Sequence, residues 1–231
     1  MIFAAGLGTR LKPLTDTMPK ALVPLAGKPL LQWQVEKLRD AGITDIIVNV
    51  HHFPDMIIDT IRANEGWGCH ITVSDERDLL LDTGGGLKKA IKNLQPILAC
   101  NVDILSNIDL RALMSAYDKT GISQLVVSER PTQRYLCFDK QDRLCGWTNI
   151  ATGELKGQDG RHLAFSGCQV LSPEVLYRLS QMPDGKFSLI DFYLHVMQDV
   201  PLAAYVPKDY KMMDVGKIDQ IEEAERFAQS L

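Results

Sequence analysis

Short β-branched runs alternate with amphipathic helical patterns through the first half of the chain, and this alternation constrains the fold more than any other feature. Residues 45–50 predict a buried strand between two predicted helices, at 30–41 and 54–64. Such helical crossovers are what join parallel strands, whereas antiparallel neighbours need only a tight turn. Further strands are predicted at 2–5, 69–74, 97–100 and 122–128, and further helices at 85–94 and 110–119. We therefore predict an α/β fold with a Rossmann-like, mostly parallel twisted sheet flanked by helices.

The pattern changes after Pro131. Polar and apolar residues then alternate over 135–139, 143–149 and 161–171, which is typical of antiparallel strands. Helices at 173–180, 188–198 and 217–229 and a strand at 202–206 are predicted to follow. No repeat or linker separates the two patterns, so we predict a single domain over residues 1–231, with halves at about 1–130 and 131–231. The first strand is short before its loop begins, which leaves the completeness of the N-terminus open.

Composition excludes several classes of protein. Hydrophobic residues make up 45% of the 231 residues and charged residues 23%, which favours a packed core over disorder. A formal net charge of −4 disfavours a nucleic-acid partner, and no apolar run is long enough for a membrane partner. The start of the chain lacks the pattern of a secretion signal. We expect free thiols and a cytoplasmic location, because no C-x-x-C pair occurs among Cys69, Cys100, Cys137, Cys145 and Cys168.

A glycine-rich loop follows the first predicted strand. Residues 4–10 read Ala-Ala-Gly-Leu-Gly-Thr-Arg, and Pro19-Lys20 follows. Glycines let backbone N–H groups approach a phosphate, while Arg10 can hold two phosphate oxygens and Lys20 adds a point charge. The simpler interpretation is a tight turn without a ligand, but the added cations favour a polyphosphate site.

Two familiar phosphate loops do not fit this segment. A dinucleotide-binding loop needs a third glycine where Leu11 stands and a helix that opens at once, whereas Pro13 and Pro19 favour a long loop. A P-loop needs serine or threonine after Gly-Lys, whereas Pro29 follows Gly27-Lys28.

A second glycine cluster lies at residues 81–86, which read Leu-Asp-Thr-Gly-Gly-Gly, shortly after Glu76. Glycine is costly inside a helix, so the cluster is expected to open one and to let a flat base lie on bare backbone. The alternative is a glycine-rich helix start with no ligand role.

Two distant aspartates are candidate metal ligands. Asp103 follows the apolar strand at 97–100, and Asp214 lies between an extended segment and the last predicted helix. Mg²⁺ prefers hard oxygen ligands, so two carboxylates from distant parts of the chain could hold it; the alternative is that each caps a turn or helix. His51 and His52 are adjacent in sequence at a strand end and point to opposite faces, which disfavours a metal pair. Asp191 is interpreted as a buried structural acid.

The loop at 4–15, together with Pro19-Lys20 and Gly27-Lys28-Pro29, resembles the signature of the sugar-phosphate nucleotidyltransferases, and the likeness extends along the whole chain. Within that family, the short length and residues 81–86 look closest to the N-acetylmuramate 1-phosphate uridylyltransferases. The resemblance implies a GT-A-like fold with a nucleotide-binding first half and an antiparallel sugar-binding region in the second. It also implies these roles: catalytic phosphate contacts from Arg10 and Lys20; nucleotide contacts from Ala5, Gly6, Gly8, Thr9, Glu76, Gly84 and Gly85; Mg²⁺ ligands from Asp103 and Asp214; and a sugar contact from Gly167.

The chain departs from the family pattern at three points. Val102 replaces the usual glycine before the first aspartate. Asp82-Thr83-Gly84-Gly85 stands where many relatives have Gly-Thr-Ala-Gly, so the identity of the nucleotide base is left open. Glu76 could instead accept hydrogen bonds from the N–H groups of guanine. No match is found for the lysine that holds the sugar phosphate in larger relatives.

The resemblance implies an enzyme that transfers a nucleoside monophosphate from a nucleoside triphosphate, with UTP favoured, to a sugar 1-phosphate and releases pyrophosphate. Mg²⁺ is the expected cofactor. A nucleotide-sugar-dependent glycosyltransferase, with Asn101-Val102-Asp103 as its metal motif, and a non-catalytic nucleotide-sensing regulatory subunit stay as alternatives. The sugar and the oligomeric state are left open.

Overall fold

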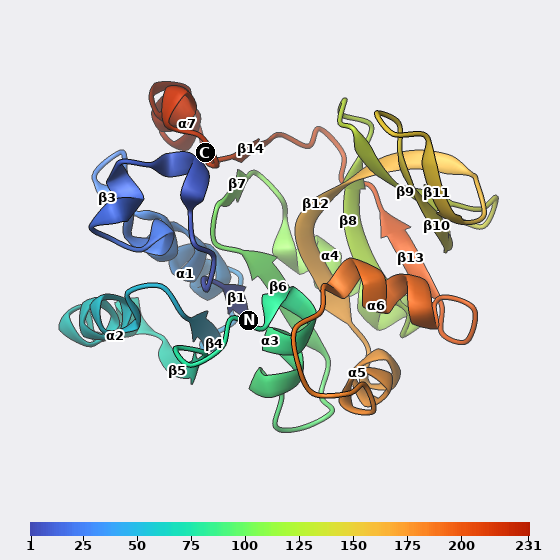
Figure 1. The fold of residues 1–231 in the computed structure, drawn as a ribbon, viewed down its shortest axis with the longest axis horizontal. Helices are drawn as coiled ribbons and strands as arrows, with labels where there is room; N and C mark the ends of the chain where they lie inside the picture. The colour runs from blue at the N-terminus through green and yellow to red at the C-terminus, as the bar shows by residue number, and fades with distance from the viewer. The chain divides into compact units, whose positions relative to one another are not determined.

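Two units assemble from separate stretches of the chain in the computed structural model, which describes residues 1–231 (Figure 1). Unit 1 contains residues 1–82, 100–110 and 211–231, and unit 2 contains residues 83–99 and 111–210. Part of the predicted first half therefore lies in unit 2. The organisation as a single domain stays a prediction.

Parallel strands form the sheet of unit 1. β1 (Ile2–Phe3) pairs in parallel with β4 (Asp45–Val50) and with the end of β6 (Ile97–Asn101), and β4 pairs in parallel with β5 (His70–Asp75). The predicted α/β class and parallel strands are thus found where the β-branched runs stand. Because the strands are parallel, their carboxyl ends and the loops that follow them lie at one edge of the sheet.

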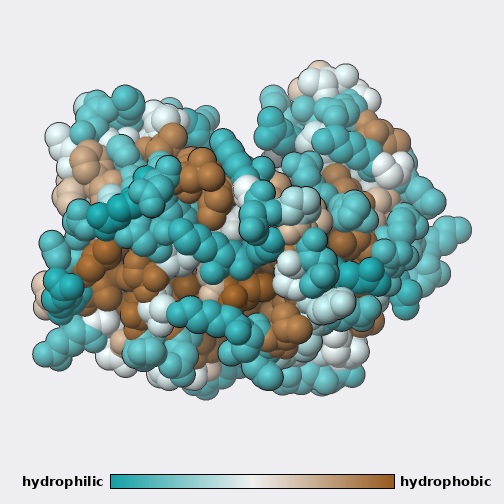
Figure 2. Space-filling model, turned by 60° about the horizontal axis from the view of Figure 1, so that its bottom comes forward, coloured by the Kyte–Doolittle hydropathy of each residue, from teal (hydrophilic) through white to brown (hydrophobic).

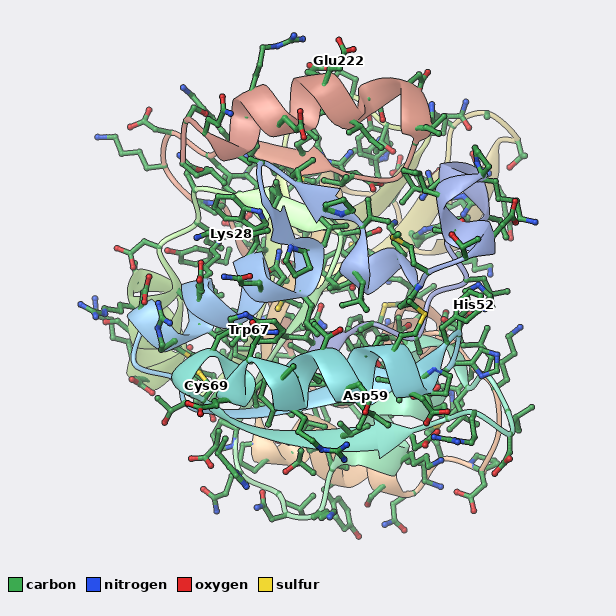
Figure 3. All side chains as sticks on the ribbon, turned by 90° about the vertical axis from the view of Figure 1, so that its left-hand side faces the viewer. Lys28, His52, Asp59, Trp67, Cys69 and Glu222 are labelled. Atoms are coloured by element: carbon green, nitrogen blue, oxygen red, sulfur yellow. The ribbon has the colours of Figure 1, made fainter.

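Amphipathic helices accompany these strands. α1 (Leu30–Asp40) buries the face carrying Leu31, Val35 and Leu38, as its periodicity predicts. α2 (Pro54–Ala63) runs alongside β5 in Figure 3. α7 (Ile221–Ala228) lies beside the hairpin of β2 (Pro24–Leu25) and β3 (Lys28–Pro29), where the Ala26 N–H donates to Glu225 Oε1 at 3.4 Å (Figure 1).

A short antiparallel ladder that the sequence analysis did not predict joins two remote segments of unit 1. β7 (Ile104–Ser106) pairs with β14 (Met212–Asp214), with Ile104 opposite Asp214. The Val215 N–H extends the contact by donating to the Asp103 carbonyl at 2.8 Å. The two predicted metal ligands are therefore neighbours in space.

Unit 2 is built on a mostly antiparallel sheet. Its strands follow one another in the order β11 (Glu154–Gly157), β10 (Leu144–Asn149), β9 (Arg134–Phe138), β12 (Arg161–Leu171), β8 (Ser123–Ser128) and β13 (Leu202–Tyr205). Each pair is antiparallel except β8 with β13. The predicted change to antiparallel strands after residue 131 is confirmed. β11 was not predicted, because it is polar and exposed and has no hydrophobic alternation.

The helices of unit 2 correct two predictions. α4 (Leu110–Thr120) and α5 (Pro173–Ser180) lie where expected. α6 (Leu189–Val196) begins with an N-cap, in which Ser188 Oγ accepts from the Asp191 N–H at 3.1 Å and donates to the Asp191 carboxylate at 2.7 Å. Asp191 is thus structural but exposed, because it lies on the solvent side of α6 while Leu189 and Phe192 occupy the buried side; the predicted burial was wrong.

The second correction concerns the glycine cluster. α3 spans Asp82–Ala90, so the helix starts three residues before the predicted position and contains the glycines. A side chain at Gly84 would collide with Phe187, since an added Cβ would lie 2.4 Å from its ring. Close packing from a distant segment therefore outweighs the low helix propensity of glycine.

Hydrophilic residues cover most of the face drawn in Figure 2, with hydrophobic residues lying between them in several smaller areas. No helix of this chain combines the length and the apolar character that crossing a bilayer requires.

Candidate active site

The glycine-rich loop after β1 packs closely against Thr15 and Lys20. Gly8 has a φ of 65°, and a Cβ there would lie 2.8 Å from Thr15 Cγ2 and 3.1 Å from Lys20 Cβ. Thr15 Oγ1 donates to the Gly8 carbonyl at 2.8 Å, which closes the loop on itself. Gly8 is therefore required both by the left-handed backbone and by the close approach, whereas a Cβ at Gly6 would meet nothing within 4 Å.

Lys20 and Asp103 form an ion pair in unit 1. Lys20 is only 8% exposed, and its ammonium group contacts the Asp103 carboxylate. A cation this buried requires an acidic partner, because an uncompensated charge away from water is strongly destabilising. Asp103 reaches this position because β6 delivers it at the carboxyl end of the parallel strands.

Arg10 and Asp214 form a second, more exposed pair beside the first. Their guanidinium and carboxylate groups lie 4.0 Å apart, and both side chains are about half exposed. A Cβ at Gly216 would lie 2.6 Å from Asp214 Oδ1 and 2.9 Å from Arg10 Nη2, so a side chain there would displace the ends of both members of this pair. The backbone bond between Val215 and Asp103 brings the two pairs together.

The donor set fits a hard divalent cation. Asp103 lies in the turn just before β7, and Asp214 ends β14, the strand that pairs with β7. Mg²⁺ favours such carboxylate oxygens while keeping water or phosphate in its other positions. Each carboxylate also faces a cation, so binding of a metal would compete with Lys20 at Asp103.

Lys28, although part of the same sequence signature, has another role. Its ammonium group lies 2.6 Å from Glu36 Oε2 and 4.8 Å from the centre of the Trp33 ring. Burial raises the pKa of Glu36, but hydrogen bonds from Gln32 and Lys28 outweigh it and hold the pKa below its ordinary value. Lys28 thus anchors α1 to the β2–β3 hairpin.

Glu76 belongs to a buried network that the sequence analysis missed. Glu76 is 1% exposed, and its carboxylate accepts from Asn49 Nδ2 at 2.8 Å and from the Leu81 N–H at 3.2 Å. Asn49 Oδ1 in turn accepts from the Ala4 N–H at 2.8 Å. The signal was an asparagine inside the apolar run of residues 46–50. The network fixes the start of the glycine-rich loop against the ends of β4 and β5.

The adjacent histidines contact different segments, as their position after a strand predicts. His51 Nδ1 lies 2.7 Å from the Glu76 carbonyl, whereas His52 Nε2 lies 3.1 Å from the Thr15 carbonyl. His52 lies near the N-terminal end of α2 in Figure 3, and Cys69 lies near the other end of that helix. His52 therefore braces the outer part of the glycine-rich loop.

The amide groups of Gly84 and Gly85 already have a partner within unit 2. Both N–H groups donate to the Phe187 carbonyl, at 2.9 and 3.2 Å, and Thr83 Oγ1 accepts from the Leu189 N–H at 3.0 Å. These bonds tie the start of α3 to the segment before α6. They support the alternative interpretation of a structural helix start, and the predicted contact with a base stays a prediction.

Gly167 lies at an irregularity of β12. Its φ is 65°, and the pairing with β8 shifts register between Phe165 and Gln169. Ser166 Oγ and Gln169 Oε1 are buried and have no hydrogen-bond partner in the protein. Arg130, which the sequence analysis missed, donates through Nη2 to the Phe165 carbonyl at 2.9 Å and leaves its Nε unpaired. A polar ligand or water can satisfy such atoms.

Comparison with known proteins gives these residues their context. Residues 1–230 match the family described as Nucleotidyl transferase. The chain is 32% identical over 219 residues to the N-acetylmuramate alpha-1-phosphate uridylyltransferase of Caulobacter vibrioides, covering 90% of this chain and 88% of that protein. It is 42% identical over 180 residues to the enzyme of the same description from Neisseria meningitidis, covering 76% and 75%. The crystal structure of HddC from Yersinia pseudotuberculosis complexed with GMP-PN aligns with a TM-score of 0.76 and 26% identity, covering 98% and 97%.

The chain belongs to the nucleotidyl transferase family. It is a sugar-1-phosphate nucleotidyltransferase, as the resemblance implied, and the expected GT-A-like α/β fold is confirmed. Neither the glycosyltransferase nor the regulatory-subunit alternative is favoured by this membership. The structure brings Arg10, Lys20, Asp103 and Asp214 together, while the role of each stays a prediction.

Proposed function

We propose that this chain transfers UMP from UTP to N-acetylmuramate α-1-phosphate, producing UDP-N-acetylmuramate and pyrophosphate. The observation that carries the proposal is the convergence, within unit 1, of two cations and two carboxylates around the glycine-rich loop. Two relatives that align over most of their own length support the choice of UTP and of this sugar. We place the activity in the cytoplasm, since all the cysteines are free.

The reaction is an in-line displacement at the α-phosphorus. An oxygen of the sugar phosphate forms a new bond to that phosphorus, the bond to the bridging β-phosphate oxygen breaks, and pyrophosphate leaves with the electron pair. The attacking oxygen is already anionic at neutral pH, so no general base is required. Catalysis therefore depends on alignment and on neutralising the charge of the polyphosphate.

Alignment and charge neutralisation come from different residues of the site. Backbone N–H groups around Gly6 and Gly8 approach the triphosphate, and Arg10 holds phosphate oxygens with its planar guanidinium group. Lys20 is released from Asp103 and stabilises the charge that develops on departing pyrophosphate. Asp103 and Asp214 would hold Mg²⁺, which supplies further charge neutralisation at the phosphates.

The second substrate is assigned to the polar atoms of β12. Ser166, Gly167 and Arg130 offer a hydroxyl, a backbone without a side chain and a cation at one irregularity of the strand. We propose Arg130 for the sugar phosphate, because a guanidinium group matches a phosphate with two parallel hydrogen bonds.

A matrix of nucleoside triphosphates against sugar 1-phosphates, with Mg²⁺ and read by pyrophosphate release, tests the proposal. We expect the highest kcat/KM for UTP with N-acetylmuramate α-1-phosphate. Preference for GTP or for a hexose 1-phosphate would refute the assigned substrates and leave the nucleotidyltransferase class intact. Arg130→Ala should raise the KM for the sugar phosphate and leave the KM for UTP unchanged.

A further inference from the structure

A cysteine, an aspartate and a histidine meet on the antiparallel sheet of unit 2. His162 of β12 pairs directly with Cys137 of β9, so their side chains project from the same face of the sheet. Asp159 lies in the turn between β11 and β12. One ligand atom from each of the three residues lies within 4.8 Å of the other two. None of them belongs to the candidate active site.

The two distances from the aspartate lie on either side of those in a tetrahedral metal site. Asp159 Oδ1 lies 2.6 Å from His162 Nε2 and 4.0 Å from Cys137 Sγ. Bond lengths of about 2.3 Å to sulfur and about 2.0–2.1 Å to nitrogen and oxygen place tetrahedral zinc ligands roughly 3.4–3.6 Å apart. A movement of the carboxylate by about 1 Å, away from the imidazole and toward the sulfur, brings its own two distances to these values. Cys137 Sγ and His162 Nε2 lie within 4.8 Å of each other and have to approach to about 3.6 Å around the ion.

Glycines hold the aspartate in place. A Cβ at Gly160 would lie 2.3 Å from the Phe138 carbonyl, and one at Gly146 would lie 2.2 Å from the Gln158 carbonyl. Side chains at these positions would lift the turn away from β9 and β10. The Gly160 N–H also donates to Asp159 Oδ1 at 2.9 Å, which orients the carboxylate.

The imidazole is positioned as well. The Tyr135 and His162 rings stack with their centres 5.7 Å apart and an angle of 22° between their planes. The stack limits rotation of the ring, so binding of an ion costs less conformational entropy. Asp159 and His162 are exposed, so an ion can bind to them from solvent, whereas Cys137 is buried and contributes its sulfur from the protein interior.

We propose that unit 2 binds one Zn²⁺ through Cys137 Sγ, the Asp159 carboxylate and His162 Nε2, with water as the fourth ligand. A mixed sulfur, nitrogen and oxygen set suits Zn²⁺ and Co²⁺, whereas Mg²⁺ requires oxygen ligands. The ion ties β9 to the turn between β11 and β12. Cys145 is not a ligand, because its thiol is directed at the backbone carbonyls of Cys137 and Gln158, at 3.4 and 3.6 Å. The proposal does not depend on the assigned substrates.

Cobalt titration of the full chain, first freed of metal by a chelator, tests the site. We expect one equivalent of Co²⁺ to give the charge-transfer absorption of a thiolate ligand, which distinguishes this site from any ion bound by Asp103 and Asp214. Zn²⁺ should displace the cobalt and raise the melting temperature. His162→Ala and Cys137→Ala should lose the absorption and weaken binding by more than about 100-fold, since loss of an outer-shell partner alone costs 10–100-fold.

Cys145→Ala is the matched control, because it removes a neighbouring thiol and should retain the absorption. His162 is partly exposed, so its replacement is expected to leave the fold intact and keeps the test decisive if Cys137→Ala fails to fold. Gly160→Ala should weaken binding by displacing Asp159. Absence of the thiolate absorption in the wild type, its persistence in His162→Ala, or its loss in Cys145→Ala would each overturn the proposed ligand set.

Discussion

The ammonium group of Lys20 contacts the carboxylate of Asp103, although 83 positions separate the two residues in the chain. The pair joins the glycine-rich loop to the end of a central parallel strand. Lys20 is buried, so its ion pair with Asp103 holds the ammonium group against the glycine-rich loop even when no nucleotide is bound. In the proposed reaction, a bound polyphosphate would compete with Asp103 for this cation, and a metal would compete with Lys20 for the carboxylate.

Replacing Lys20 by methionine should lower kcat/KM by about 100-fold or more, because the variant lacks the preorganised charge that we propose stabilises the departing pyrophosphate. Lys28→Met is the matched control: this lysine belongs to the same sequence signature but pairs with Glu36. Its replacement should leave turnover close to that of the wild type. Steady-state rates of pyrophosphate release measure both variants, and similar losses in the two would exclude the special role of Lys20.

The two loop glycines should respond differently to alanine. Gly8→Ala introduces a Cβ in left-handed backbone and against Thr15, so we expect unfolding to become easier by about 1–2 kcal/mol. Gly6→Ala meets open space and should change the free energy of unfolding by less than about 0.5 kcal/mol while raising the KM for the nucleoside triphosphate. Urea unfolding and steady-state kinetics separate these effects. A stable Gly8→Ala variant with normal kinetics would contradict the proposed loop geometry.

Gly84→Ala tests whether the second glycine cluster packs or binds. The new methyl group would meet both the ring and the carbonyl of Phe187, and overpacking of this kind costs about 1–3 kcal/mol. Phe187→Leu in the same chain should recover part of that loss, as measured by a double-mutant cycle in urea. If Gly84→Ala instead keeps its stability and loses only affinity for the nucleotide, the predicted base contact is supported over the structural role.

Tyr193→Phe should stabilise unit 2. Tyr193 is completely buried and its hydroxyl has no hydrogen-bond partner, so removing that oxygen should gain about 1 kcal/mol at pH 7. Burial also raises the pKa of Tyr193 far above its ordinary value. The unfolded chain therefore loses this proton near pH 10 while the folded chain keeps it, and wild-type stability falls as the pH rises above that point.

The phenylalanine variant lacks this contribution, so its advantage over the wild type should grow between about pH 9 and pH 11. Urea unfolding at neutral and alkaline pH measures the difference. Tyr177→Phe is the control, because Tyr177 is exposed and its replacement should change little at either pH. Destabilisation by Tyr193→Phe at neutral pH would indicate that the hydroxyl is satisfied in solution.

Local pattern was sufficient to predict the principal elements. The run at 45–50 is β4 to the residue, and the helix expected at 30–41 is α1, because hydrophobic periodicity within a short window decides both. The four charged residues could also be singled out, since charge and glycine spacing are visible in the sequence. Their meeting in unit 1 needed the structure, because the β7–β14 ladder that aligns Asp214 is too short to leave a pattern.

Long-range packing explains what the sequence could not reveal. Nothing near Gly84 indicates that Phe187 will occupy the space above it. The partnership of Asn49 with Glu76 likewise depends on β4 lying beside β5, which periodicity alone does not specify. The exposed position of Asp191 follows from a helix boundary, and boundaries are set by capping side chains rather than by the hydrophobic pattern.

Unit 1 is discontinuous, and this has a consequence for biosynthesis. Asp214 arrives with the third of its segments, after all of unit 2 has been translated. A nascent chain therefore cannot place both carboxylates beside the glycine-rich loop until residues 211–231, which contain β14, have been synthesised. The enzyme should consequently acquire activity in one late step during synthesis, and chains that stall early should have none.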